Sequence, residues 1–265
     1  MPDSIISCSV LVSSCDAYSD LWTPFFTLFW RHWPDCPLPV YLGTNFAECK
    51  HPRVRTLHAG TDESWSHNLR SFIGYLDSDY VLLLLEDFFF TQRVNTRTIE
   101  TYIAALDELG GATLRLRPNP PPDGRVPGYE PLGSVDARAP FRVSAQAGIW
   151  NRRDLQALLR SGESAWEFER NATERSRSRS GGFYCIRKPV IHYMHVVERG
   201  RWFRHAARRF GGAQIGCDFQ ARGIVPYGET VKKRMHSAMR AIANRAVVLR
   251  LQARRGGRLC RESLS

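Results

Sequence analysis

Apolar runs and helical spacings alternate along the first 117 residues of this chain. Apolar, partly β-branched runs predict strands at residues 5–12, 40–43, 79–86 and 112–117. Helices are predicted between them, at residues 21–33, 61–76 and 95–109. We expect Asp20 and Asn95 to cap the first and the last of these helices. Strands and helices in alternation are typical of an α/β fold with a doubly wound, mostly parallel sheet.

The predicted strand at residues 79–86, DYVLLLLE, is continuously apolar rather than alternating. Such a strand is usually covered on both faces, so we expect it in the middle of the sheet. The helix that precedes it carries Trp65, Leu69, Phe72, Ile73 and Leu76 on one face. That spacing predicts the face of the helix that packs on the sheet.

The second half of the chain is less regular. Residues 118–140 are rich in Pro and Gly and predict a long loop. Further strands are expected at residues 141–150, 184–186 and 190–197, a helix at 153–160, a short helix or turn at 164–170 and a basic low-complexity loop at 174–182. We therefore expect one domain over residues 1–210 and a basic helical extension over residues 211–265.

The positive charge is concentrated near the end of the chain. The net charge is +11, and residues 231–261 hold ten Lys and Arg residues and no acid. The rest is nearly neutral, which argues against a nucleic-acid binder that uses the whole domain. Helical spacing in the tail predicts a basic amphipathic helix. Such a helix either lies on an anionic membrane surface or packs on the domain with its charges in solvent.

Location and redox state follow from what the sequence lacks. No apolar run approaches the roughly 20 residues that span a bilayer, and the N-terminal segment has no basic region of a signal peptide. We expect a cytoplasmic protein, peripheral on the inner face of the membrane if the tail binds lipid. The seven cysteines are scattered without a C-x-x-C pair, so reduced thiols and no zinc site are expected.

Two acids, Glu86 and Asp87, stand between the apolar strand and the triplet Phe88-Phe89-Phe90. In an open α/β sheet, ligands bind beyond the carboxyl ends of the strands. A carboxylate pair there, walled by aromatic rings, suits a divalent cation that also binds a diphosphate. The alternative is that these acids only mark the exit of the strand into solvent.

Four stretches together resemble a known family: SSCDAYSDLW, the helix from Trp65, LLLLEDFFF, and VSAQAGIWNRRDL followed by SAWEFE. Over roughly residues 4–205 the chain resembles GT-A-fold glycosyltransferases that use nucleotide sugars. More narrowly, it is similar to small bacterial transferases that build capsule or lipopolysaccharide glycans. The resemblance implies a Rossmann-like GT-A fold, a nucleotide-sugar donor, a glycan or lipid-linked acceptor, and no nucleic-acid partner.

The resemblance also assigns residues to the donor site. The residues expected to bind the nucleotide and its phosphates are Ser13, Ser14, Asp16, Tyr18, Trp65, Arg70, Glu86 and Asp87. The family motif is Asp-x-Asp, whereas this chain has Glu86-Asp87-Phe88. Asp87, supported by Glu86, is therefore expected to bind Mn²⁺ or Mg²⁺, but a strict requirement for the cation does not follow.

A second acidic site is expected at SAWEFER. Ser164 followed by Glu167 is a capping-box pattern, which gives Glu167 a structural role. Glu169 is left as the preferred general base of an inverting transfer, with Glu167 as the other candidate. Acceptor contacts are expected from Gln146, Trp150 and Trp166. The rings of the two tryptophans also suit a position in the core.

Two further elements remain open at this stage. The Arg/Ser-rich loop at residues 174–182 either closes over the donor diphosphate as a lid or is an unstructured linker. His192 and His195 lie on a predicted strand, and one of them is a candidate late metal ligand.

Two other functions compete with glycosyl transfer. A sugar nucleotidyltransferase would have a Gly-rich loop with a Lys after the first strand, and SSCDAYSD has neither residue. A non-catalytic protein that binds nucleic acid through its tail would show strongly salt-dependent binding. That second alternative leaves EDFFF and SAWEFE without a role.

Overall fold

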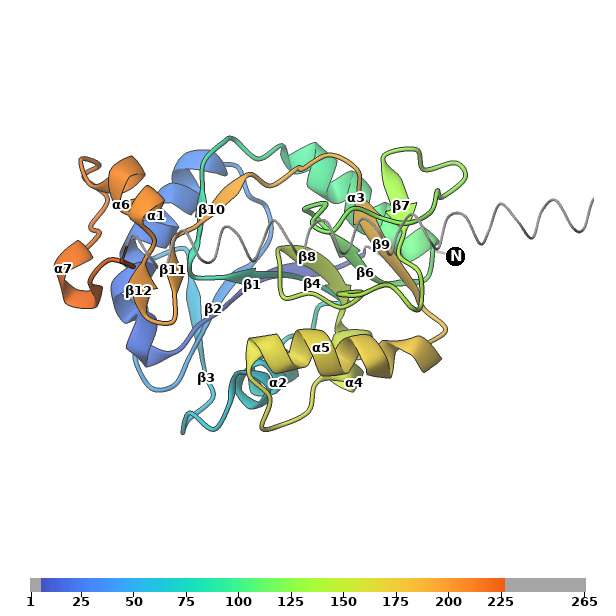
Figure 1. Ribbon diagram of the computed structural model, residues 1–265, viewed down its shortest axis with the longest axis horizontal. Helices are drawn as coiled ribbons and strands as arrows, with labels where there is room; N and C mark the ends of the chain where they lie inside the picture. Colours follow the sequence, from blue (N-terminus) through green and yellow to red (C-terminus); the bar gives the residue numbers. More distant parts are fainter. Residues whose placement is uncertain (1–5, 227–265) are drawn as a thin grey trace, which may run out of the picture.

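Figure 1 shows the computed structural model of the chain, which describes residues 6–226. Within that range eight strands form one sheet in the order β3-β2-β1-β4-β8-β6-β9-β7. Their bounds are β1 Cys8–Ser13, β2 Val40–Thr44, β3 Arg55–His58, β4 Tyr80–Leu85, β6 Gly111–Arg115, β7 Leu132–Ser134, β8 Gly148–Asn151 and β9 Gly182–Ile186. The apolar strand β4 lies in the middle of this sheet, as its composition predicts.

Helices cover both faces of the sheet (Figure 1). Their bounds are η1 Asp16–Leu21, α1 Trp22–His32, α2 Trp65–Gly74, α3 Thr96–Glu108, α4 Arg152–Leu158, α5 Ala165–Arg175, η2 Ser176–Ser178, α6 Arg204–Phe210 and α7 Phe219–Arg222. Leu82 and Leu84 of β4 belong to the core shared with α1 and α3. Val81 and Leu83 belong to the opposite core, with α2, α4 and α5. The two-sided burial of β4 confirms the α/β, Rossmann-like architecture.

The sheet is mixed rather than uniformly parallel. β1 runs parallel to both β2 and β4, but β8 lies between β4 and β6 and is antiparallel to both. Gly148 at the start of β8 pairs with Leu83 near the end of β4. The chain that enters β8 therefore arrives at the carboxyl edge of β4, where the acidic motif follows.

The phenylalanine triplet forms strand β5, Phe88–Phe90, which pairs with β10, Tyr193–His195. All three rings are buried. Phe90 packs on the α1 ring Phe29 at a centroid distance of 5.4 Å, and Phe89 packs on Trp202 at 6.0 Å. The triplet is thus the core of a second, small sheet. Next to it, β11 Val197–Glu198 and β12 Arg201–Trp202 form a hairpin.

Several local expectations differ from the structure. Residues 141–147 are loop, and only residues 148–150 of the expected strand are extended, within β8. Strand β7 interrupts the expected loop at 118–140. Asp20 does not cap α1, because the chain enters that helix through η1 and the Asp20 carboxylate pairs with Arg222. Asn95 does cap α3, accepting a hydrogen bond from the Thr98 backbone N–H at 2.9 Å.

The predicted basic tail helix at 231–261 lies outside the described residues. The described part of the expected extension, residues 211–226, contacts the main domain: Arg222 on α7 pairs with Asp20. The division at residue 210 stays a prediction. The cysteines at positions 8, 15, 36, 49, 185 and 217 are free thiols, as expected. No helix within residues 6–226 is long and apolar enough to cross a membrane.

Gly43 on β2 tests the close packing of α2 on the sheet. An added Cβ at this position would lie 2.3 Å from ring carbons of Phe72, which is fully buried and cannot move aside. We expect Gly43→Ala to lower the free energy of unfolding by about 1–3 kcal/mol in chemical denaturation. Gly74, at the end of α2, has nothing within 4 Å of an added Cβ. Gly74→Ala should be neutral or stabilising by up to about 1 kcal/mol, and equal losses in both variants would contradict this packing.

Candidate active site

A cavity of about 680 Å³ opens at the carboxyl edge of β1 and β4. Ser13 at the end of β1 lies in register with Leu85 at the end of β4, so the segments that follow the two strands start side by side. Residues 117–119 after β6 and residues 144–146 before β8 reach the same edge because of the antiparallel insertion. The mixed sheet thus brings segments distant in sequence to one site, the position at which ligands bind in open α/β sheets.

The loop after β1 contributes Ser13, Ser14 and Tyr18 to the cavity wall, as predicted. The Ser13 hydroxyl is buried and has no hydrogen-bond partner within the described chain. The Ser14 hydroxyl accepts a hydrogen bond from the Trp22 indole N–H at 2.8 Å. Tyr18 is half-buried, and the Arg222 guanidinium lies 4.3 Å from the centre of its ring. The loop therefore contributes an aromatic ring and a buried, unpaired hydroxyl to the cavity wall.

Asp16 has a structural role instead of the expected ligand contact. Its carboxylate accepts hydrogen bonds from the backbone N–H groups of Asn45, Phe46 and Ala47, the shortest at 2.9 Å. It does not line the cavity. The side chain ties the β1–α1 connection to the β2–β3 connection, which holds the loop that carries Tyr18.

Helix α2 places one expected residue in the cavity and one outside it. Trp65 lines the cavity and packs on Phe168 with ring centres 5.3 Å apart, so it serves both wall and core. Arg70 is exposed and lies outside the lining. Asn68, which the sequence did not single out, is buried beside Trp65. Its amide donates to Asp62 at 2.8 Å, and its side-chain oxygen has no partner within the described chain.

The two acids at the end of β4 are both buried. Burial raises the pKa of Glu86 to about 7 against the opposing charge of Arg222. Burial and the adjacent Glu86 carboxylate raise the pKa of Asp87 well above its usual range. One oxygen of Asp87 has no hydrogen-bond partner among the described residues. The interpretation of these acids as a mere strand exit is therefore wrong.

The other Asp87 oxygen lies 3.1 Å from Nε2 of His195 on β10. Burial lowers the pKa of His195 to about 4, so the imidazole is neutral at pH 7, and the two side chains lie within hydrogen-bonding distance. His192 does not line the cavity. Pairing of β5 with β10 thus brings His195, one of the two candidate histidines, to the acidic motif.

Asp87 and His195 are the side chains that could hold a divalent cation at this site. The described residues contain no group of three or more His, Cys, Asp or Glu side chains arranged to hold a metal. Asp87 still offers a free carboxylate oxygen, and His195 offers an imidazole nitrogen next to it. Such a site suits a hard cation only if ligand oxygens and water complete its shell.

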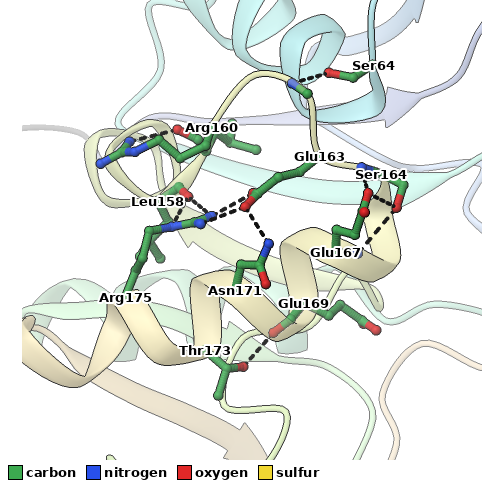
Figure 2. Close-up of polar contacts among 12 residues, drawn as sticks. Ser64, Leu158, Arg160, Glu163, Ser164, Glu167, Glu169, Asn171, Thr173 and Arg175 are labelled. Atoms are coloured by element: carbon green, nitrogen blue, oxygen red, sulfur yellow. Dashed lines mark hydrogen bonds and ion pairs between the residues drawn. The ribbon is translucent and has the colours of Figure 1, made fainter.

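Figure 2 shows that the two candidate bases on α5 differ in their surroundings. The exposed Glu167 side chain completes the capping box: Ser164 donates to it from its backbone and its hydroxyl, and the pKa of Glu167 is lowered by these bonds. Glu169 lines the cavity and accepts hydrogen bonds from the Ser144 hydroxyl and the Ala145 backbone N–H, both at 2.8 Å. Burial raises the pKa of Glu169.

An ion pair anchors the helix that carries Glu169 (Figure 2). Both oxygens of Glu163 accept from Arg175 at 2.7 Å, and Arg175 also donates to the carbonyl of Leu158. The Glu163 carbonyl accepts from the Ser66 backbone N–H at 3.0 Å. The loop before α5 is therefore fixed to α2, which sets the direction of the Glu169 side chain.

The expected acceptor residues divide in the same way. Gln146 and Trp166 line the cavity, and Trp166 is 59% exposed, so its ring is free to contact a ligand. Trp150 is fully buried on β8. It belongs to the core because it packs in the interior between the sheet and its helices, which corrects its expected contact with the acceptor.

The basic segment 174–182 is not placed as a lid. Residues through Ser178 are helical, Arg179 pairs with Asp154, and none of the segment lines the cavity. Two arginines that the sequence analysis missed, Arg117 and Arg199, line it instead. Neither belongs to a recognisable sequence motif: Arg117 follows β6, and Arg199 lies in the turn of the β11–β12 hairpin.

No protein-family model and no curated protein sequence matches this chain. Among solved structures, it is similar to S. aureus TarS 1–349, with 14% identity and a TM-score of 0.46 over 71% of this chain and 59% of that chain. The TarS 1–349 complex with UDP has 13% sequence identity and a TM-score of 0.49, over 72% of this chain and 61% of that chain. The galactosyltransferase LgtC, solved with donor and acceptor sugar analogues, has 12% sequence identity and a TM-score of 0.37, over 56% of this chain and 59% of that chain. The chain thus spans about three fifths of the length of these three solved chains, and 37% of the longer solved TarS chain.

Glu86→Gln tests the cost of the buried acid at the end of β4. Because burial raises its pKa to about 7, the folded protein binds this proton more tightly than the unfolded chain does. Stability should therefore fall as the pH rises from about 4.5 to about 7. We expect the variant to be more stable than wild type at pH 8, on the order of 2 kcal/mol, and similar at pH 4.5.

Thermal unfolding across this pH range, without divalent cations, measures the difference. The control is Glu167→Gln, because the pKa of Glu167 is lowered rather than raised. A Glu86→Gln protein that unfolds more easily than wild type at pH 8 would contradict the assigned cost.

Proposed function

We propose that this chain is a glycosyltransferase that takes its sugar from a nucleotide-sugar donor. The observation that carries the proposal is the cavity in which the Glu86-Asp87 pair and Glu169 share one space. Glycosyl transfer needs charge control at the leaving diphosphate and a separate carboxylate to activate the acceptor. The two acidic positions come from the sheet edge and from α5, so each is held by a different element.

The β1 and α2 side of the cavity suits the nucleotide. Tyr18 offers a ring for stacking, and the Ser13 hydroxyl and the Asn68 oxygen lack partners within the described chain. Buried polar atoms without partners are costly unless a ligand satisfies them. Asp87 would hold Mn²⁺ or Mg²⁺ together with the diphosphate, and a bound cation would take up the charge of the leaving group.

Glu169 is the proposed general base. Two hydrogen bonds from the 144–145 segment fix one of its oxygens, and its raised pKa makes it a stronger proton acceptor than an ordinary glutamate. It would take the proton from the acceptor hydroxyl while that oxygen attacks the anomeric carbon opposite the nucleotide. Transfer by this route inverts the configuration at that carbon.

Gln146 and the exposed ring of Trp166 would contact the acceptor. The resemblance of the sequence to bacterial surface-glycan transferases supports a glycan or lipid-linked acceptor. A cytoplasmic enzyme, peripheral on the inner membrane face, would meet such an acceptor.

Binding of nucleoside diphosphates tests the donor site. In calorimetric titrations with UDP, GDP, CDP and dTDP, each with and without Mn²⁺, we expect the wild-type protein to bind one nucleotide most tightly. Asp87→Asn should weaken that binding by about 10- to 100-fold in Mn²⁺, since a charged ligand contact is lost. Arg70→Gln, outside the cavity, should bind like wild type. Absence of binding for all four nucleotides would overturn the proposed function.

Glu169→Gln tests the general base. With water as the acceptor, release of nucleoside diphosphate from the nucleotide sugar should fall about 10²- to 10⁴-fold, while nucleotide binding persists. In wild type the rate should fall as the pH drops through the raised pKa of Glu169, because the base becomes protonated. Glu167→Gln is the matched control, since glutamine also completes a capping box. Equal losses in both variants would contradict the assignment.

A further inference from the structure

The hairpin β11–β12 turns through two residues, Arg199 and Gly200. Their φ angles are 49° and 76°, as a type I′ turn requires at both central positions. Asn-Gly is the favoured pair for this turn, because asparagine tolerates the left-handed region that longer side chains avoid. An arginine at the first position therefore strains the backbone.

Positive φ at residues other than glycine is confined to two positions in the described chain, Phe141 and Arg199. Both line the same cavity. Strained backbone persists only where the surroundings hold it, and it concentrates at functional sites. The coincidence at one cavity indicates that the position of these two side chains matters more than local stability.

The Arg199 guanidinium is free to bind a ligand. Arg199 is exposed and has no hydrogen bond or ion pair to any other described residue. Arg117, the other arginine in the lining, donates to the Tyr193 carbonyl at 3.2 Å and lies 4.8 Å from the centre of the Tyr193 ring. Arg117 is held by the protein, whereas Arg199 is uncommitted.

The charge of the cavity explains why such an arginine is needed. Five carboxylic acids line it: Asp62, Glu86, Asp87, Glu169 and Glu198. A diphosphate entering this space meets like charge from those acids that are ionised. A guanidinium binds phosphate oxygens through two parallel hydrogen bonds and keeps its charge at any working pH.

We propose that Arg199, presented by the strained hairpin turn, binds the diphosphate of the donor. This inference rests on the proposed function. The turn holds the arginine at the cavity at a cost in stability. Substitution of Arg199 should therefore weaken diphosphate binding, and a residue that tolerates positive φ should at the same time raise the stability of the fold.

The experiment compares R199N, R199Q and R199K with wild type, and uses R201Q as the matched control on the same hairpin, outside the cavity lining. Titration uses the diphosphate that wild type binds most tightly among UDP, GDP, CDP and dTDP, and then the corresponding monophosphate and nucleoside. Inorganic pyrophosphate serves as a second probe, and thermal unfolding is measured for each protein.

R199N and R199Q should bind the diphosphate and pyrophosphate about 10- to 100-fold more weakly, with nucleoside binding unchanged. R199K should lose less, because it keeps the charge but not the paired donors. R199N should also unfold at a higher temperature than R199Q, by roughly 2–4 °C, since asparagine relieves the strain. R201Q should bind like wild type.

Contrary results separate this inference from the proposed function. If wild type binds a nucleotide and the R199 variants bind it equally well, or lose nucleoside and diphosphate alike, the role of Arg199 is overturned while the donor site stands. Equal stability of R199N and R199Q would remove the strain argument and overturn it as well. If wild type binds none of the four nucleotides and no pyrophosphate, both proposals fall.

Discussion

The site depends on how the chain leaves strand β4. Two adjacent carboxylates are buried there because the three phenylalanines that follow pair with β10 and pack in the hydrophobic core that β4 shares with α1. Because Phe88, Phe89 and Phe90 are buried in β5, the backbone re-enters the protein interior directly after Glu86 and Asp87. The acids consequently stay at the bottom of a cavity instead of moving into solvent, and their raised pKa values are the electrostatic cost of that position.

The opposite wall is held by polar contacts in addition to the apolar packing of Phe168 and Ala172. The Glu163–Arg175 pair, the Ser164 cap and the backbone contact to α2 fix the start of α5 (Figure 2). From that base Glu169 reaches the 144–145 segment. A rigid acidic edge and a polar, anchored helix thus face each other across the space in which ligand chemistry is proposed.

The parts that local rules govern were predictable from the sequence. The apolar run of β4, the Asn95 cap and the capping box of Ser164 with Glu167 all depend on residues close together in the chain, so their patterns are readable. Glu86 and Asp87 were singled out because they directly follow a continuously apolar strand, and Glu169 because Glu167 is used by the capping box. Asp16 was misjudged because its partners are backbone groups thirty residues away.

The missed residues share a different cause. Asn68, Arg117 and Arg199 reach the cavity through packing and strand pairing across the molecule, and none has a motif of its own. Trp150 was misplaced because the strand that carries it is antiparallel and fully interior. Side-chain type alone does not report which face of such a strand meets the ligand.

The antiparallel direction of β8 determines which parts of the sequence line the cavity. Because β8 starts beside the end of β4, the segment from 116 to 147, which includes β7, returns to the edge of the sheet at which Tyr18 and Asp87 also lie. Residues 13–88 supply part of the cavity lining, and segments after residue 116 supply the rest. The residues proposed to contact the donor and those proposed to contact the acceptor therefore come largely from separate parts of the chain.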